Sequence, residues 1–542
     1  MGDLDVFGGG PSWATGLAWI DVLIIFCYFI FIVLLGVKYS KSKDEASYFL
    51  AGRGMTWPVI GFSLFAASIS SSTLIGQAGD AYSTGIAVFN YNLISVLVMV
   101  FFAWFLLPFY IKSKIFTIPE FLEKRFSVHS RYYFSGITIV VNIFLDAAGS
   151  LYAAAMVMKL IFPEVSITVL AAVFALIVAA YTIPGGLSAA IRVDLMQGIF
   201  LLVGSIVLTV FATVNGGAQY VKELLAEGDL LMKLVRPMSD KSVPWLGMIV
   251  GIPILGLFFW GNNQQLVQRV LTAKSIDEGR KGVLLVGFLT MLTLFIIIIP
   301  GVMSIDLFPN LPKPDMVYPN MIMQLLPNAL IGFMMAAMVA ALTSSLSGLL
   351  NSVATLFTMD FYSKWVPESS SKQKVVIARI VSLVVLLIAV LWAPQIGRRF
   401  GTLLKYYQEM LSIMAPPIVA AFLIGIFWKR ANAKGAFAGL MAGMLLGSVN
   451  MFFSVKMGTS IFGDMHFLLT VPFYFVWSIL VMIVVSLGTE KPKEEKVKGY
   501  TWSLAEFKQE TLDLREKSLF SSYRFWSLFL ILFCVIVLII FW

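Results

Sequence analysis

The chain has 542 residues, of which 59% are hydrophobic and 13% are charged. Soluble domains carry roughly 25% charged residues, so this composition, with a mean hydropathy of +0.89, excludes a soluble globular protein and predicts an all-α polytopic membrane protein. The net charge of +9 does not indicate nucleic-acid binding, because the Lys and Arg residues stand in short segments between apolar runs.

The first apolar run, Trp19–Val37, follows an acidic leader that contains Asp3 and Asp5. No basic segment precedes this run and no small-residue cleavage site follows it, so we expect a retained span rather than a signal peptide. The two cysteines, Cys27 and Cys534, lie in apolar runs near opposite ends of the chain and predict neither a disulfide framework nor a metal site.

Fourteen apolar runs are candidates for transmembrane helices, which need about 20 apolar residues each. No segment between them is long enough for a soluble domain, so we expect a single transmembrane domain over residues 1–542. The runs are Trp19–Val37, Val59–Ala78, Ile86–Ile111, Tyr133–Phe162, Ile167–Ala180, Leu195–Val214, Trp245–Leu271, Val283–Met303, Asn328–Met359, Val375–Trp392, Tyr406–Trp428, Ala436–Phe453, Phe467–Leu487 and Trp526–Trp542.

The basic loops predict one orientation in the plasma (inner) membrane. If the N-terminus is outside, the loops rich in Lys and Arg all fall inside, as the positive-inside rule requires. We therefore expect both termini on the outer side. The charges that support this orientation are Lys38, Lys41, Lys43, Lys112, Lys114, Lys124, Arg125, Arg269, Lys274, Arg280, Lys281, Lys429, Arg430, Lys434, Lys491 and Lys493.

Two spans carry clusters of Gly, Pro or Ser where a helix favours Leu or Ala. These clusters, Ala66–Gly79 and Gly251–Gly261, are five spans apart. Interruptions at corresponding positions of two halves predict broken helices around a binding site near the middle of the membrane.

Five stretches, spread in order over most of the chain, carry longer motifs: Ala51–Gly54 (AGRG), Thr117–Phe126 (TIPEFLEKRF), Trp260–Lys274 (WGNNQQLVQRVLTAK), Ser344–Tyr362 (SSLSGLLNSVATLFTMDFY) and Gly425–Ala436 (GIFWKRANAKGA). Together they resemble the sodium/solute symporter family, and within it the bacterial sodium/sugar branch of the sodium/glucose cotransporters.

This resemblance implies the LeuT fold, with two inverted five-helix repeats and accessory helices, 14 transmembrane helices in all. It implies a sodium-coupled symporter that imports a small polar solute, foremost a sugar or polyol, by alternating access. The expected parts are an outer leader and first accessory helix (1–50), the first repeat (51–214), the second repeat (245–430) and the accessory C-terminal helices (431–542).

A sodium site is expected where one broken helix faces a later span. Sodium favours oxygen ligands, and the break exposes backbone carbonyls such as those of Ala66 and Ile69. Ala341, Ser344 and Ser345 share one helix face, and the resemblance implies sodium ligands at all five positions. The alternative from spacing alone is that these small residues permit close helix packing while the hydroxyls bond back to their own helix.

Asp194, in the stretch IRVDLMQ near the inner end of a span, has three interpretations. It is a stop on the sodium exit path, part of a second ion site with Ser344 and Ser347, or an interfacial or capping aspartate. Relatives with a second sodium site carry a further hydroxyl where this chain has Gly348. The sodium stoichiometry, one or two, therefore stays open.

Asp146 lies near the middle of the run Tyr133–Phe162, where an ionised carboxylate costs at least about 2.5 kcal/mol and so faces a polar cavity or a partner. The resemblance implies that it recognises the solute. A carboxylate accepts hydrogen bonds from hydroxyls or pairs with a cation, which keeps a cationic amine or a zwitterion such as an amino acid as the alternative solute. The other interpretation is a buried aspartate held by neighbouring helices.

The resemblance extends the solute site to further hydroxyl, amide and aromatic groups that suit a small polar ligand. Where galactose-transporting relatives carry a glutamate, a lysine and a gating tyrosine, this chain has Asn92, Thr290 and Phe259, so galactose is not implied. Phe259 and Trp260 also fit lipid-facing or core aromatic residues. The implied solute ligands are Ser68, Ser70, Thr73, Asn92, Asp146, Trp260 and Gln408, with Tyr91 and Phe259 as gates.

Other functional classes have little support in the sequence. The only histidines, His129 and His466, lie at span or loop edges, and no HExxH, GxSxG or Walker motif occurs, so we do not expect an enzyme. A sensor and a sodium or water channel are the remaining classes, and saturable sodium-dependent uptake separates a symporter from a channel. The expected partners are sodium, a small polar solute and the lipid bilayer.

Overall fold

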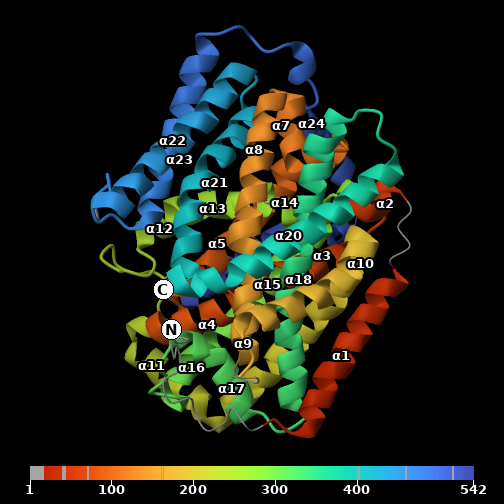
Figure 1. Ribbon diagram of the computed structural model, residues 1–542. Coiled ribbons are helices and arrows are strands. Elements are labelled where there is room, and N and C mark those ends of the chain that lie inside the picture. Colours follow the sequence, from red (N-terminus) through yellow and green to blue (C-terminus); the bar gives the residue numbers. More distant parts are fainter. Residues whose placement is uncertain are drawn as a thin grey trace.

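The computed structural model describes residues 17–39, 44–69, 72–159, 162, 164–399, 403–457, 460–515 and 518–542. These residues form a bundle of packed helices (Figure 1). Within the described ranges the β-type pairings are two isolated bridges, Met55 with Ala273 and Arg236 with Pro244. The all-helical prediction is confirmed.

The helices of the first half are α1 (Trp19–Lys38), α2 (Glu45–Leu50), α3 (Trp57–Ser68), α4 (Gln77–Thr84), α5 (Asn90–Phe101), α6 (Leu107–Lys112), α7 (Ile118–Arg125), α8 (Val128–Val141), α9 (Ala148–Lys159), α10 (Ile167–Ala212), α11 (Ala218–Glu227), α12 (Trp245–Val250) and α13 (Ile252–Leu257). Those of the second half are α14 (Gln264–Val270), α15 (Ile276–Thr293), α16 (Ile299–Leu307), α17 (Val317–Leu325), α18 (Leu330–Leu356), α19 (Ser363–Trp365), α20 (Ser371–Arg399), α21 (Leu403–Phe427), α22 (Ala433–Met457), α23 (Phe467–Leu487), α24 (Leu504–Arg515) and α25 (Tyr523–Ile540).

Twelve helices of the described chain are long and apolar enough to cross a membrane. The difference from the fourteen expected runs arises at two places. The run Val59–Ala78 is broken after α3, which has only 12 residues, and α10 covers two of the runs in one stretch of 46 residues. Gly186, with φ 56° and ψ −147°, interrupts this stretch just after Pro184. At 1.5 Å per residue, 46 helical residues would reach about 69 Å, more than twice the membrane core of about 30 Å.

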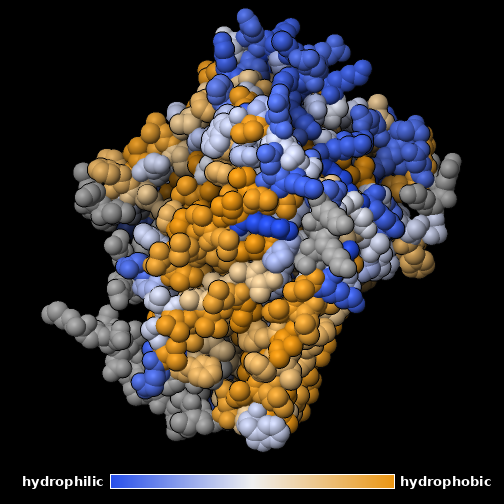
Figure 2. Space-filling view, turned by 45° about the vertical axis from the view of Figure 1, so that its right-hand side comes forward, coloured by the Kyte–Doolittle hydropathy of each residue, from blue (hydrophilic) through white to orange (hydrophobic). Residues whose placement is uncertain are grey.

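The surface divides into an apolar zone and a hydrophilic end. Figure 2 shows hydrophobic residues covering most of one face, with hydrophilic residues gathered at the top of the molecule. Large apolar side chains are exposed on α10, α20 and α22, among them Leu176 (70%), Leu387 (61%) and Leu445 (66%). Such side chains are compatible with lipid as the surrounding solvent.

The core is organised around α18, which is buried along nearly its whole length and packs against α10, α3, α9 and α20. The helix α1 packs on the N-terminal end of α18, where Asp21 Oδ1 accepts hydrogen bonds from the backbone N–H groups of Ala329 and Gly332, both at 2.7 Å. This contact fixes the first turn of α18.

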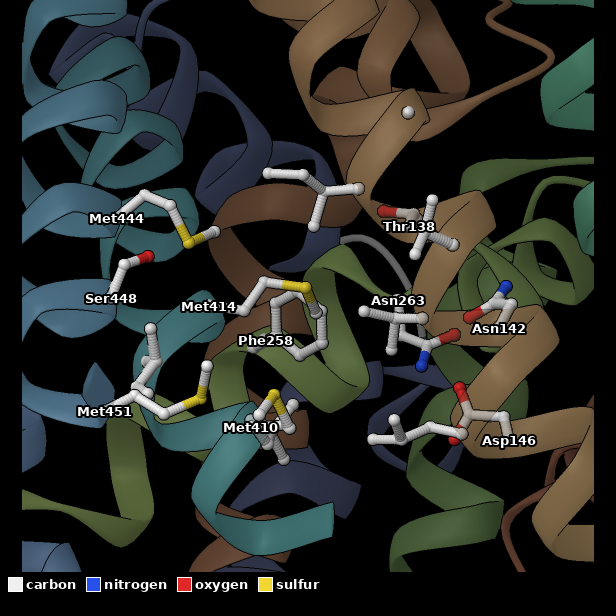
Figure 3. Close-up of a pocket in the computed structure, with 17 residues that line it drawn as sticks. Thr138, Asn142, Asp146, Phe258, Asn263, Met410, Met414, Met444, Ser448 and Met451 are labelled. Carbon is white, nitrogen blue, oxygen red and sulfur yellow. The ribbon is translucent and has the colours of Figure 1, made fainter. Parts of the chain in front are cut away.

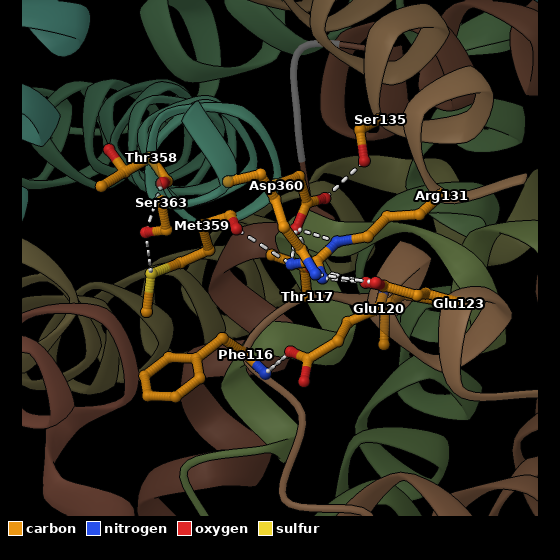
Figure 4. A network of polar contacts seen from close by, with 12 residues as sticks. Phe116, Thr117, Glu120, Glu123, Arg131, Ser135, Thr358, Met359, Asp360 and Ser363 are labelled. Carbon is orange, nitrogen blue, oxygen red and sulfur yellow. Dashed lines mark hydrogen bonds and ion pairs between the residues drawn. The ribbon is translucent and has the colours of Figure 1, made fainter. Parts of the chain in front are cut away.

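A network of buried charges anchors the other end of α18 (Figure 4). Asp360, in the π-helical turn η12 (Phe357–Tyr362), is fully buried and pairs with Arg131 of α8 at 2.6 Å. Its carboxylate also accepts hydrogen bonds from Thr117 at 2.6 Å and from Ser135. Glu123 of α7 pairs with Arg131 in turn. A buried carboxylate with this many partners fixes the three helices relative to one another.

Candidate functional site

The first broken helix is present where the Gly, Pro and Ser cluster predicted it. The helix α3 ends at Ser68, Ile69 has an extended ψ of 93°, and helical structure resumes at Ser72. Thr73 Oγ1 donates to the carbonyl of Ser68 at 3.1 Å across the break. Because the last carbonyls of a helix have no intrahelical donor, the end of α3, which includes Ala66, offers oxygen atoms to other groups.

The second broken helix lies between α13 and α14. The π-helical segment η9 (Phe258–Asn262) ends there, and Asn263 takes an extended conformation with ψ 119°. The two broken helices are paired at one end, where Met55 N donates to the carbonyl of Thr272 and Lys274 N donates to that of Met55. Both α3 and α14 also pack against α18.

The serines of α18 face these breaks. Ser345 is buried, and its hydroxyl donates to the carbonyl of Ala67 at 3.3 Å, while its own carbonyl accepts from Gln265 Nε2 at 3.2 Å. Ala341 and Ser344 are also buried on this helix. The structure thus brings α18 against the end of α3, the arrangement that the predicted sodium site requires.

Ser344 points to Asp194 instead of its own helix. Its hydroxyl donates to Asp194 Oδ1 at 2.6 Å, and Asp194 Oδ2 accepts from Ser63 at 3.0 Å. Arg269 Nη2 and Nε lie 2.7 and 3.1 Å from the same Oδ2 atom. Four helices, α3, α10, α14 and α18, therefore meet at one buried carboxylate, which is more than an interfacial or capping role needs.

Ser347 has a different partner. Its hydroxyl accepts a hydrogen bond from Thr182 Oγ1 at 2.8 Å, on the first part of α10. Asp194 and Ser344 are in contact, as expected, whereas Ser347 contacts Thr182. A Cβ atom at Gly348 would lie 2.7 Å from Arg269 Nη2, so the guanidinium occupies the space that a side chain at this position would need.

A second polar group surrounds Asn92 of α5. Its Nδ2 atom donates to Gln77 Oε1 at 3.0 Å and to Thr293 Oγ1 at 2.8 Å, and Gln77 Nε2 donates back to Asn92 at 3.1 Å. These residues come from α4, α5 and α15. Tyr91, a predicted gate, is half-buried beside Asn92 on α5.

The predicted aromatic gate lies on η9. The rings of Phe259 and Trp260 meet edge to face at 5.3 Å, with Trp260 buried and Phe259 half-buried. The burial of Trp260 removes the lipid-facing interpretation for that ring.

Asp146 lies in the wall of a cavity of about 410 Å³ between α8, α21, α22 and η9, which Asn263 of the second break also lines. It belongs to the π-helical turn η6 (Asn142–Ala147). Figure 3 shows Asp146, Asn142 and Asn263 gathered at one end of the cavity, with methionine side chains at the other. The sequence predicts a polar cavity or a partner for this carboxylate, whereas the cavity that it lines is mostly apolar. Of the other predicted solute ligands, Ser68, Thr73, Asn92 and Trp260 do not line this cavity, and Ser70 and the side chain of Gln408 lie outside the described residues.

Sequence reasoning missed Arg269 and Gln77. The positive charge of Arg269 was assigned to an inner loop, but the side chain is completely buried. Its signal was its place inside the motif WGNNQQLVQRVLTAK, where it falls four residues after Gln265 and so on the same face of a helix. Gln77 lies within the first predicted break, and an amide in an otherwise apolar span was the signal for it.

The family model described as the sodium:solute symporter family matches residues 48–443 of the chain. The sheep (Ovis aries) sodium/glucose cotransporter 1 is 32% identical to it, over 91% of this chain and 82% of the relative. The human sodium/myo-inositol cotransporter is also 32% identical, over 92% of this chain and 79% of the relative.

Two solved structures are similar in fold. A Na⁺-coupled sialic acid symporter in a substrate-bound outward-open state superposes with a TM-score of 0.78 at 23% identity, over 88% of this chain and 99% of that one. Mhp1, a nucleobase-cation-symport-1 family transporter, gives a TM-score of 0.55 at 13% identity, over 85% and 99% of the two chains.

Proposed function

Because the chain belongs to the sodium:solute symporter family, we propose that it imports a sugar or polyol together with sodium, by alternating access in a LeuT-type fold of two inverted repeats. Sodium is the coupling ion of this family. The observation that carries the proposal is the hydrogen bond from the Ser345 hydroxyl to the carbonyl of Ala67, at 3.3 Å, which joins α18 to the end of the broken helix α3. Sodium takes the carbonyls of Ala66, Ile69 and Ala341 and the hydroxyls of Ser344 and Ser345.

Alternating access follows from the position of this site. Sodium bound between α3 and α18 holds the two helices together and orders the break, where Thr73 and Ser68 stand. Because the solute binds beside the same break, each ligand raises the affinity of the other by the same factor. The rings of Tyr91 and Phe259 close over the solute, and Trp260 contacts it.

The sugar or polyol assignment rests on the polar groups beside the break. Gln77, Asn92 and Thr293 offer amide and hydroxyl groups, which suit a neutral polyhydroxylated solute. These groups already bond to one another, so a solute exchanges hydrogen bonds with them without leaving a buried polar group unpaired. The two 32%-identical relatives are named as cotransporters of glucose and of myo-inositol.

A cationic amine or zwitterion is the second candidate solute, and one observation favours it. Asp146 presents a carboxylate to a cavity that is otherwise mostly apolar, and a cation would pair with it there.

We propose one sodium ion per cycle. The guanidinium of Arg269 lies against Asp194 and fills the space beside Gly348, so a positive charge already neutralises the carboxylate on which a second ion would depend. One sodium crossing 100 mV releases about 2.3 kcal/mol, and a tenfold sodium gradient adds about 1.4 kcal/mol. Together these sustain a solute gradient of several hundredfold, on the order of 10² to 10³.

We also propose fourteen crossings, with both termini on the outer side of the plasma membrane. The stretch α10 is long enough for two crossings with a turn at Gly186, and α3 with α4 forms a broken one. The basic loops share one end of the molecule, because Lys112 pairs with Glu506 and Lys496 donates to the carbonyl of Glu123. Their common position supports the inner side for this end.

The test is uptake by the purified protein in liposomes, with sodium, lithium or potassium gradients and a panel of sugars, inositols, amino acids, amines and carboxylates. The proposal predicts that a neutral sugar or polyol accumulates only with the sodium gradient. Accumulation of an amine or amino acid would select the second candidate. Uptake that is independent of sodium would overturn the symport mechanism.

A further inference from the structure

The cavity beside Asp146 is also open to the lipid-facing surface. The helices α8 and α22 touch near their first turns, where Tyr133 Oη donates to the carbonyl of Leu440 at 3.4 Å and its ring meets Phe437 at 6.3 Å. Beyond this contact, Gly136 and Val140 of α8 and Met444, Ser448 and Met451 of α22 line the cavity. Val140, Ser448 and Met451 are exposed, so the cavity reaches the surface between the two helices.

The opening coincides with a residue that has no side chain. A Cβ atom at Gly136 would meet nothing within 4 Å, which contrasts with the tightly packed glycines elsewhere in the bundle. Ser448 and Met451, on the opposite wall, are exposed. The mouth of the cavity thus lies between α8 at Gly136, which has no side chain, and the side chains of Ser448 and Met451 on α22.

Apolar residues surround this mouth. Val140 is 55% exposed on α8, and Met441, Leu445 and Phe452 are 43%, 66% and 57% exposed on α22. The helical stretch Val128–Met156, which begins with α8, and the stretch Ala433–Ser454 of α22 are long and apolar enough to span a membrane. Exposed apolar side chains on spanning helices contact lipid, so the inner surface of the cavity continues the lipid-contacting surface.

The lining is suited to a flexible hydrocarbon chain. Met410, Met414, Met444 and Met451 project into it beside the ring of Phe258 (Figure 3). Methionine side chains adapt to irregular ligands because they are unbranched and polarisable. The volume of about 410 Å³ lies within the range of ligand sites, roughly 300–1,000 Å³. The polar groups Asn142, Asp146 and Asn263 stand together at the far end (Figure 3).

We propose that one acyl chain of a membrane phospholipid enters this cavity sideways between α8 and α22 and lies along the methionines of α21 and α22. A chain already in the bilayer loses no hydrophobic burial by entering, and the walls gain the dispersion contacts that an unfilled space lacks. The polar group around Asp146 limits how deep the chain goes.

This occupant links the bilayer to the transport machinery. The acyl chain packs on Phe258, which is next to the proposed gate residue Phe259 on η9. It also packs on α21, whose second turn contains the proposed solute ligand Gln408. This consequence rests on the proposed function, whereas the binding of the chain does not.

The experiment uses the full-length protein in phosphatidylcholine liposomes that contain a trace of phospholipid with a diazirine in the middle of one acyl chain. After illumination, mass spectrometry locates the labelled residues. The expected result is label on the cavity residues Met414 and Met444, which face inward. Gly136→Leu fills the mouth, and it favours the helix because Leu has the higher helix propensity. It is expected to abolish label at both methionines.

Two further variants keep the test decisive. Ser448→Phe closes the mouth from α22 and is expected to give the same loss if Gly136→Leu folds poorly. Leu176→Phe adds bulk at an exposed site on α10, away from the cavity, and is expected to keep the label. Absence of label from Met414 and Met444, label that survives both mouth-filling variants, or equal loss in Leu176→Phe would overturn the proposal. None of these outcomes depends on whether sodium drives uptake.

Discussion

Arg269 Nη2 lies 2.7 Å from Asp194 Oδ2, and both side chains are completely buried. The hydroxyl of Ser344, one of the proposed sodium ligands, donates a hydrogen bond to Asp194 Oδ1 at 2.6 Å. The ion pair therefore joins α14, which follows the second break, to α10 and to the serine-bearing helix α18. Any motion that separates α14 from α10 must first separate these charges.

Replacing Asp194 by Asn is predicted to lower the free energy of unfolding by about 3–5 kcal/mol, because it leaves the guanidinium of Arg269 buried without a counter-charge. Thermal unfolding of the purified protein, followed by tryptophan fluorescence, measures the change. The matched control is Glu506→Gln, which breaks an exposed pair with Lys112 (61% and 55% exposed) and is expected to change stability by about 0–1 kcal/mol. Equal effects of the two variants would contradict the role of the buried pair.

Wild-type uptake is predicted to depend hyperbolically on sodium concentration. Arg269 neutralises Asp194 and occupies the space beside Gly348, so only the site between α3 and α18 is left for sodium. Initial uptake rates over a range of sodium concentrations, at fixed membrane potential, measure this dependence. A sigmoidal curve would show cooperative binding of more than one ion and would refute the one-sodium proposal.

Asp146→Asn is predicted to raise the KM for the solute roughly tenfold to hundredfold, because a hydrogen bond to a charged group contributes about 1.5–3 kcal/mol. The sodium dependence measured at saturating solute should change much less. The control is Asp306→Asn, an exposed aspartate on α16, which should leave both unchanged. If the KM of Asp146→Asn equals that of the wild type, Asp146 does not contact the solute.

Glu123 is predicted to make the fold sensitive to acid. Its partial burial raises its pKa, but the hydrogen bonds and charges of Lys364 and Arg131 outweigh that effect, and its pKa lies below the ordinary value. The ionised carboxylate therefore stabilises the fold above the ordinary pKa, and this contribution is lost as the pH falls through the lowered pKa. Glu123→Gln should be less stable than the wild type at neutral pH, and the difference should vanish in acid. A difference that is constant with pH would contradict this assignment.

Much of the fold follows from the sequence because the helix breaks have local causes. The small and flexible residues around Ile69 and the Gly and Asn residues that follow Trp260 interrupt helices where the pattern predicts it. The division of α10 has a local cause as well. Pro184 and Gly186 lie between the two predicted runs, and Gly186, with φ 56° and ψ −147°, interrupts the helix there, while small residues such as Ala189 and Ala190 pack in the buried part that follows.

The candidate site was only partly accessible to sequence reasoning. Spacing brought Ala341, Ser344 and Ser345 onto one face, and the buried contacts of both serines agree with it. Spacing could not pair Arg269 with Asp194, because the two residues are 75 positions apart. The positive-inside rule applies to exposed loop residues, so it could not identify Arg269 as a buried partner. The cavity around Asp146 depends on how α8 and α22 diverge, which no local pattern encodes.

The most direct test of sodium coupling at α18 is sodium-gradient uptake by Ser345→Ala compared with Ser382→Ala. Ser382 is also buried, but its hydroxyl donates to the carbonyl of Ala378 on its own helix, so its loss should leave sodium dependence unchanged. Ser345→Ala should raise the sodium concentration for half-maximal uptake by about twofold to tenfold, since one ligand hydroxyl contributes about 0.5–1.5 kcal/mol. Sodium dependence in Ser345→Ala that matches both the wild type and Ser382→Ala would contradict the proposed site.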